Sequence, residues 1–168
     1  MPQIKIREWN EKPRTKLRFI KIGDIFCYQF SEEMFVFGQI LGKVNVGHVI
    51  QFFDIFQASP TITVEELSRA QFIGKPIIID SYTLFDRSPV WSWQIIGHQV
   101  DFDPSPFKDL AFKWGDPNGP QFGKVWLDGR TEPKIFSREE VEDLDWEACV
   151  GSIVYNRILE EELDKQMK

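Results

Sequence analysis

Asp24-Ile-Phe-Cys-Tyr-Gln-Phe30 is the first of three consecutive apolar runs that decide the fold class of this chain. The second run is Met34-Phe-Val-Phe-Gly-Gln-Ile-Leu41, and the third is His48-Val-Ile-Gln-Phe-Phe-Asp-Ile-Phe56. The connections between them are short and polar or bounded by glycine, as in hairpins. Because aromatic and β-branched residues dominate all three runs, we expect three consecutive β-strands.

Alternation within these runs predicts a sheet with apolar groups on both faces. Phe26 and Tyr28 point to one side of the first strand, and Ile25 and Cys27 point to the other. This pattern indicates a central or doubly covered strand. Gly38, inside the second run, predicts a bulge, a bend or a close backbone approach. Such curvature fits a curved antiparallel sheet or a small barrel-like sheet.

Short strands and helices are predicted around these three runs. Further strands are expected at residues 4–6, 75–80, 90–97 and 123–127. Capping-box patterns at Thr63/Glu66 and Ser137/Glu140 predict short helices at 64–70 and from 137 to about 144. A final helix at 146–166 carries an apolar stripe that we expect to pack on the sheet: Val150, Ile153, Val154, Ile158 and Leu159. The Pro- and Gly-rich residues 101–123 predict irregular loops.

The chain has 168 residues, a length typical of one domain. We expect an α+β, mostly β protein: an N-terminal arm at 1–20 and a single β-rich domain at 21–168. In that domain a short helix follows the third strand and another helix lies at the C-terminus. The sequence contains no run of ~20 apolar residues and no signal-peptide core. We therefore expect a cytoplasmic location.

Charge is distributed unevenly along the chain, whose net charge is −6. Residues 1–21 hold seven Lys or Arg and two Asp or Glu, which gives +5. Residues 137–168 hold four and ten, which gives −6. The acidic C-terminal part argues against nucleic acid as the main partner and suits a basic protein partner. The basic arm is short and interrupted, so we expect it to be solvated.

No residue pattern in the chain predicts catalysis, a metal site or a cofactor. His98 lies close in sequence to Asp101 and Asp103, which makes an acid–base pair conceivable, but no nucleophile motif accompanies it. Cys27 and Cys149 fit small buried hydrophobes better than a disulfide or a zinc site. We therefore expect no enzyme activity, no metal ion and no cofactor.

Four segments of the chain resemble the immunity protein 26 family: Lys21-Ile-Gly-Asp-Ile-Phe26, Phe35-Val-Phe-Gly-Gln-Ile-Leu41, Phe52-Phe-Asp54 and Trp93-Gln-Ile-Ile-Gly97. The resemblance covers about residues 20–100 and rests mainly on hydrophobic and glycine positions. Members of that family accompany bacterial polymorphic toxins, including contact-dependent growth inhibition systems. The resemblance implies a mostly β domain that neutralises a cognate toxin by binding it, and it assigns no toxin-contact residues.

Candidate contact residues come instead from the residue pattern. Trp91 and Trp93 are two apart, so they share one face of the predicted 90–97 strand, where a partner can meet them. Acidic residues gather at 139–147, where a basic toxin would bind. The predicted toxin-binding residues are Glu139, Glu140, Glu142, Asp143, Trp91 and Trp93.

The leading hypothesis is an immunity protein that forms a tight 1:1 complex with its toxin, expected to be a basic nuclease domain. Binding would block the active site or the partner surface of the toxin. Two alternatives belong to other classes of protein. One is a small β-barrel module that binds a ligand or nucleic acid, and the other is a hydrolase that uses His98.

Overall fold

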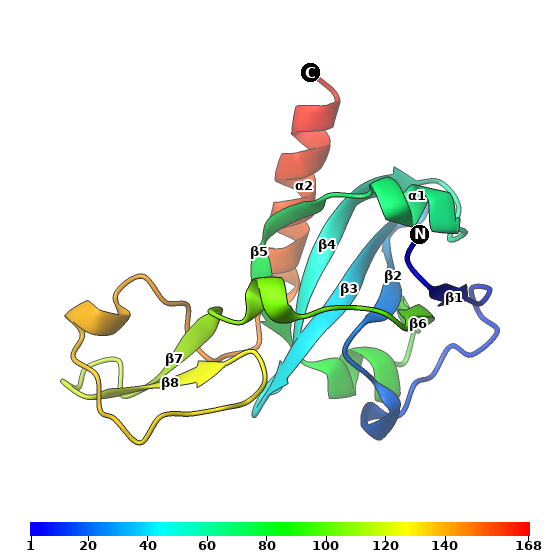
Figure 1. Ribbon diagram of the computed structural model, residues 1–168. Helices are drawn as coiled ribbons and strands as arrows, with labels where there is room; N and C mark the ends of the chain where they lie inside the picture. Colours follow the sequence, from blue (N-terminus) through cyan, green and yellow to red (C-terminus); the bar gives the residue numbers. More distant parts are fainter.

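The computed structural model, which describes residues 1–168, is built on a six-stranded antiparallel sheet with the strand order β1-β6-β2-β3-β4-β5 (Figure 1). The strands of this sheet are β1 (Ile4–Ile6), β2 (Asp24–Ser31), β3 (Met34–Val44), β4 (Gly47–Gln57), β5 (Phe72–Ile79) and β6 (Trp93–Gln99). Because β1 and β5 are edge strands that do not pair with each other, the sheet is open and not a barrel. The predicted curved antiparallel sheet is confirmed.

Short helices connect or cover the strands. The α-helices are α1 (Val64–Arg69) and α2 (Ser152–Gln166), the 3-10 helices are η1 (Leu17–Phe19), η3 (Ser105–Phe107) and η4 (Glu139–Val141), and η2 (Tyr82–Asp86) is a π-helix. The capping box predicted at Thr63 is present: its hydroxyl accepts from the Glu66 N–H, and the Glu66 carboxylate accepts from the Thr63 N–H. None of the helices has the length and apolar character needed to span a membrane.

Both faces of the main sheet are covered, as the alternation in β2 predicted. Phe26 and Tyr28 lie in the larger core, to which α2 and η2 contribute. Ile25 and Cys27 lie in a second core on the opposite face, to which α1 contributes Leu67. β2 itself is central, since it pairs with β3 on one side and β6 on the other.

Gly38 lies where the pairing of β3 with β4 is irregular. A Cβ atom at this position would clash with the Phe26 ring and would lie 2.6 Å from the carbonyl oxygen of Gln51. A backbone oxygen cannot move aside as a flexible side chain can, so only glycine fits here. The bulge and close approach predicted for Gly38 are confirmed.

The C-terminal helix begins later than predicted and buries a different face. α2 begins at Ser152 and not near 146, and its buried residues are Tyr155 and Leu159. Ile153, which the predicted apolar stripe included, is 76% exposed. The stripe is therefore only partly right, because Tyr155, whose ring packs edge-on against Trp93, turns the helix toward the sheet.

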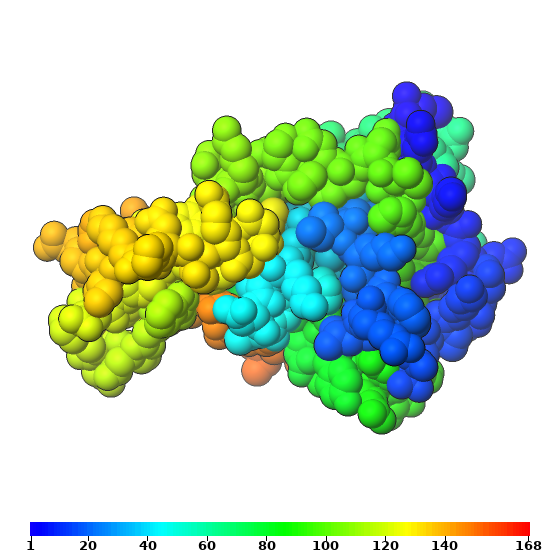
Figure 2. Space-filling view, turned by 60° about the horizontal axis from the view of Figure 1, so that its bottom comes forward, coloured from blue at the N-terminus to red at the C-terminus, as the bar shows by residue number.

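A two-stranded sheet of β7 (Ala111–Gly115) and β8 (Phe122–Trp126) projects from one end of the main sheet (Figures 1 and 2). We call residues 111–147 the lobe. The prediction of irregular loops at 101–123 is wrong for β7, because this strand is short and turn-forming residues flank it on both sides. Seven buried side chains join the lobe to the main sheet: Phe112, Val125 and Leu127 from the lobe, and Leu41, Val44, Val49 and Ile78 from the sheet.

The N-terminal arm lies at the other end of the molecule (Figure 2). β1 extends the sheet by pairing with β6. The loop that follows is fixed by Asp86 of η2: Arg14 Nε and Nη2 donate to Oδ1 at 2.9 and 2.7 Å, and the Leu17 N–H donates to Oδ2 at 2.9 Å. The hydrogen bonds from Leu17 and Arg14 hold the pKa of the Asp86 carboxyl below its ordinary value.

Candidate functional site

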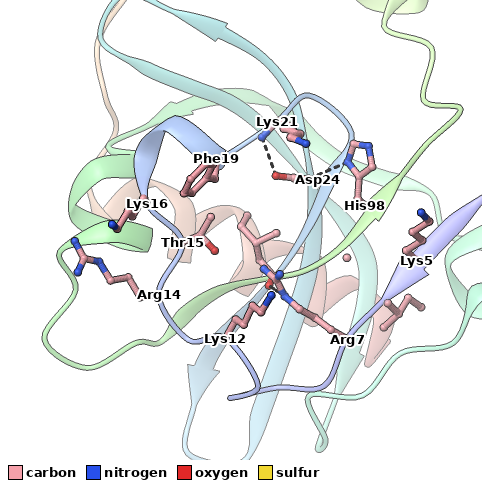
Figure 3. Close-up of a pocket in the computed structure, with 13 residues that line it drawn as sticks. Lys5, Arg7, Lys12, Arg14, Thr15, Lys16, Phe19, Lys21, Asp24 and His98 are labelled. Carbon is pink, nitrogen blue, oxygen red and sulfur yellow. Dashed lines mark hydrogen bonds and ion pairs between the residues drawn. The ribbon is translucent and has the colours of Figure 1, made fainter.

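A pocket of about 610 Å³ opens between the N-terminal arm and the sheet (Figure 3). We call it the basic pocket because six cationic side chains line it: Lys5, Arg7, Lys12, Arg14, Lys16 and Lys21. Asp24 is the only carboxylate in the lining and Thr15 the only hydroxyl. Phe19 contributes an aromatic ring, and His98 contributes an imidazole.

Strand pairing brings these cations together from distant parts of the chain. Lys5 lies directly opposite His98 in the β1–β6 register. The Arg7 N–H then donates to the Ile96 carbonyl at 2.8 Å, and its side-chain Nε donates to the Ile95 carbonyl at 2.7 Å. Because Nε is bound to the sheet, the guanidinium of Arg7 is held in place at the pocket (Figure 3).

His98 and Asp24 form a hydrogen-bonded pair in the wall of the pocket (Figure 3). Nδ1 of His98 lies 2.9 Å from Oδ1 of Asp24, while the Lys21 N–H donates to Oδ2 of Asp24 at 2.7 Å. Burial raises the pKa of the Asp24 carboxyl, and these hydrogen bonds only partly offset that effect. The contact with Asp24 fixes the imidazole and leaves Nε2 free of protein partners.

The partner of His98 is not the one that the sequence suggested. Asp101 accepts a hydrogen bond from the Gln3 N–H, and Asp103 accepts two from Ser105 in a turn. Neither carboxylate reaches His98, which pairs with Asp24 across the β2–β6 ladder. No three His, Cys, Asp or Glu side chains lie together in a way that could hold a metal ion.

The positive charge of the basic pocket is largely unneutralised. Arg14 is ion-paired with Asp86, at 2.7 Å. The other five cations have no carboxylate partner within 4.0 Å. The arm that the sequence predicted to be solvated therefore folds against the sheet edge and concentrates charge there.

The four predicted acidic contact residues lie together on the lobe, but they are not equivalent. Glu139, Glu142 and Asp143 are exposed and have no ion-pair partner. Glu140 instead bonds Lys134 at 2.8 Å and accepts the Ser137 N–H at 2.7 Å, as the predicted capping box requires. The Lys134 ammonium and these bonds lower the pKa of Glu140 to about 2. The carboxylate of Glu140 thus stabilises the lobe itself through its bonds with Lys134 and Ser137.

The two predicted tryptophans do not join this acidic group. Trp93 is 1% exposed and packs against Phe26 in the larger core, so its prediction as a contact residue is wrong. Trp91 precedes β6, and its φ of 50° is not that of a strand residue. Trp91 and Trp93 therefore do not share a strand face as predicted. It lies on the arm side of the sheet, where Gln94 bonds both Asn10 and the Trp91 carbonyl.

A different tryptophan accompanies the acidic residues. Trp146 is 37% exposed, and the Lys113 ammonium lies 5.1 Å from the centre of its ring. Trp146 borders an apolar groove of about 230 Å³ between the lobe, β5 and the start of α2. The apolar lining of this groove includes Pro76, Ile77, Phe112, Trp146, Val150 and Val154. Sequence reasoning missed Trp146, although a large aromatic residue within an acidic run was a usable signal.

Lys113 of β7 holds the acidic residues and the ring in one arrangement. Its ammonium donates to the carbonyl oxygens of Val141 and Glu142, at 3.2 and 3.4 Å. Its backbone N–H donates to the Asp145 carbonyl at 2.8 Å. At the edge of the groove, the Asp145 carboxylate pairs with Lys75 of β5 at 2.7 Å.

His48 lies at the root of the lobe and has a structural environment. It is 2% exposed, and its Nδ1 lies 2.8 Å from the hydroxyl of Ser81. Burial, together with the charge of Lys43, lowers the pKa of His48 to about 4. The imidazole is therefore neutral at pH 7. The next residue, Val49, belongs to the buried cluster that joins the lobe to the main sheet.

Comparison with known proteins identifies the scaffold that carries these features. A family model described as Immunity protein 26 matches residues 21–123, more than half of the chain. No curated protein and no solved structure matches. The matched range includes β2 to β7 and the Asp24–His98 pair, and it leaves out the arm and most of the lobe. The chain belongs to the immunity protein 26 family.

Proposed function

We propose that this protein protects its cell by forming a tight 1:1 complex with a cognate toxin, and that the toxin is a basic nuclease domain. Membership of the immunity protein 26 family supports the immunity role. The observation that carries the finer proposal is that Lys113 holds the segment with the unpaired carboxylates next to Trp146 of the apolar groove. Because nucleic acid lies in the cytoplasm, we propose that the complex forms there.

The charge on this surface fits a basic partner. Glu139, Glu142 and Asp143 are exposed on a projecting part of the molecule and are not neutralised within the protein. A nuclease binds a polyanion, so its substrate cleft carries positive charge. A convex, acidic lobe can enter such a cleft and exclude the substrate, and complementary charge also speeds the encounter.

The apolar groove supplies binding energy that exposed charges alone do not provide. Exposed ion pairs contribute little to affinity, whereas buried aromatic anchors dominate the binding energy of protein interfaces. Trp146 and the exposed Val154 lie at the groove, with the ion pair of Asp145 and Lys75 at its edge. An apolar centre with a polar rim is the usual composition of a protein interface. We therefore place Trp146 at the centre of the toxin contact.

Blocking a toxin needs a contact that is both large and slow to dissociate. A standard specific interface buries ~1,600 Å² in total, more than the groove alone offers. The toxin would therefore cover the groove, the acidic residues beside it and the exposed start of α2, where Ile153 lies. Among related complexes, differences in affinity arise mainly in the dissociation rate, so the apolar contacts should set the lifetime of the complex.

Co-expression with the product of a candidate toxin gene tests the proposal. We expect the two proteins to co-purify in 1:1 ratio, and a Glu139→Lys/Glu142→Lys/Asp143→Lys variant to bind more than about 30-fold more weakly. The matched control reverses three exposed charges at the far end of α2: Glu160→Lys/Glu161→Lys/Asp164→Lys. Equal losses for both variants would show a non-specific charge effect and contradict the assigned surface. No binding by the unmodified protein would refute the proposed function.

A further inference from the structure

We propose that the basic pocket binds a small ligand that carries two or more phosphate groups and a base, such as a nucleoside triphosphate. The site is distinct from the proposed toxin surface: residues of the arm line it, and the arm lies at the end of the molecule opposite the lobe (Figure 2). Its volume of about 610 Å³ lies within the range of pockets that hold small molecules, ~300–1,000 Å³.

The charge of the pocket selects an anion with several negative charges. Five cations without carboxylate partners face one concave space: Lys5, Arg7, Lys12, Lys16 and Lys21. Like charges held at this density repel one another, and a cleft lined by one sign of charge concentrates ions of the opposite sign. A single carboxylate or monophosphate would neutralise only part of this charge, whereas a di- or triphosphate matches it.

The pocket also contains donors that are fixed before any ligand arrives. Arg7 is held through its Nε by the Ile95 carbonyl at 2.7 Å, so its terminal N–H groups are presented as a rigid fork. Arginine in this arrangement suits bidentate recognition of phosphate oxygens. His98 is held by Asp24 through Nδ1, which leaves Nε2 available to the ligand.

The aromatic ring in the lining indicates a base in addition to the phosphates. Phe19 is 55% exposed, although apolar rings of this size are normally buried. It belongs to the pocket lining, and the guanidinium of Arg18 lies 4.9 Å from the centre of its ring. A ring beside cations is the arrangement on which nucleotide bases stack.

A small ligand fits the charge of the whole protein better than a nucleic acid strand does. The net charge is −6, and residues 22–168 together carry most of the acidic side chains. A strand that leaves the pocket would run along this acidic surface, whereas a small ligand remains among the cations. Screening reduces interactions beyond ~8 Å at physiological salt, so the pocket cations dominate the potential that a small ligand meets.

Isothermal titration calorimetry with ATP in magnesium-free buffer tests this inference. We expect measurable binding that weakens with added salt, and a loss of at least about tenfold in affinity for Arg7→Gln/Lys12→Gln. Because Arg7 also bonds the sheet, Lys12→Gln/Lys16→Gln provides a second variant without that contact. The matched control, Lys108→Gln/Lys168→Gln, removes two exposed charges outside the pocket and should leave the affinity within about twofold.

Two further probes refine the test. One separates the phosphate contribution to binding from the base contribution, and the other compares ATP with a nucleic acid strand. Phe19→Ala should weaken the binding of ATP but leave the affinity for inorganic diphosphate unchanged, since diphosphate has no base that could stack on the ring. A short single-stranded RNA should bind no better than ATP. Absence of ATP binding, an equal loss in the control variant, or RNA binding more than tenfold tighter than ATP would each overturn the inference. None of these results depends on whether the toxin binds the lobe.

Discussion

The two charged ends of this molecule use their charge in opposite ways. At the arm end, cations gather in a concave pocket, and all but Arg14 lack carboxylate partners. At the lobe end, Glu140 and Asp145 bond nearby lysines, and the free carboxylates stand on a projecting surface. A concave surface with fixed donors suits a small ligand, whereas a convex one beside an apolar groove suits a macromolecule. The same property, unpaired charge, therefore points to different partners because the shape differs.

Both ends depend on a shared support. The family match covers residues 21–123, which include the central strands, while the arm and the acidic residues of the lobe lie outside it. Each end is anchored to this support by a few contacts. Asp86 holds the arm, and a cluster that includes Phe112 and Val49 holds the lobe.

Gly38→Ala should have the largest effect, because it damages the support of both ends. The added Cβ would meet the Gln51 carbonyl oxygen at 2.6 Å and the Phe26 ring. We expect the free energy of unfolding to fall by about 3 kcal/mol, measured by urea denaturation. Gly151→Ala is the control, since its Cβ would meet no atom within 4 Å. A Gly38→Ala protein as stable as the control would contradict the close approach.

Acid should weaken the lobe end before the arm end. The folded-state pKa of His48 is about 4, against 6.5 for an ordinary histidine, because burial disfavours its charged form. Its contribution to stability is therefore fully present above pH 6.5 and is lost as the pH falls from 6.5 toward 4, by up to about 3 kcal/mol.

Chemical denaturation across this pH range measures that loss, and His48→Gln should flatten the profile. Hydrogen exchange should show earlier opening around Val49 and Phe112 than around Lys5. A His48→Gln protein with an unchanged pH profile, or earlier opening of the arm, would show that another group controls the acid response.

Trp146→Ala should weaken toxin binding by about 2 kcal/mol or more, mostly through faster dissociation. Surface plasmon resonance with the toxin measures this change. Trp114→Ala is the matched control: it is 47% exposed on the same lobe. It follows Lys113 in β7, and successive side chains of a strand point to opposite faces. If Trp114→Ala has the larger effect on binding, the toxin contacts the face away from the groove.

The smallest effect should distinguish two neighbouring carboxylates. Glu142→Gln should slow toxin association by several-fold, because its charge is free. Lys134→Gln/Glu140→Gln should change the association rate by less than about twofold, because it removes an anion and its paired cation together and leaves the net charge unchanged. Stopped-flow association at low and high salt compares the two variants. Equal effects on the rate would mean that the free charge of Glu142 does not control association.

Local patterns predicted the elements that depend on local forces. The alternating runs located β2, β3 and β4, and the pair Thr63/Glu66 marked a real helix cap. Ser137 and Glu140 do bond each other, but the helix predicted there is only the three-residue η4. These signals work because side-chain alternation and capping act over a few residues. β7 was not predicted, because five residues between turn-forming segments are too few for side-chain alternation to be recognised.

The sites were harder to predict because they depend on contacts distant in sequence. His98 lies closer in sequence to Asp101, yet it bonds Asp24 across paired strands. The basic pocket exists because β1 pairs with β6 and Arg14 meets Asp86, and neither pairing leaves a mark in the local pattern. Trp93 fits an exposed strand face in sequence, but that face belongs to the core.

The position of Lys113 means that the charged and apolar parts of the proposed toxin surface are energetically coupled. One ammonium group bonds the carbonyl of Glu142 and lies over the ring of Trp146. A change that displaces either neighbour would shift the lysine and so alter the other. In a double-mutant cycle, the effects of Lys113→Met and Trp146→Ala on toxin binding should therefore deviate from additivity by ~0.5 kcal/mol or more. Evolution of a new toxin specificity at this surface would then tend to change the two positions together, not one at a time.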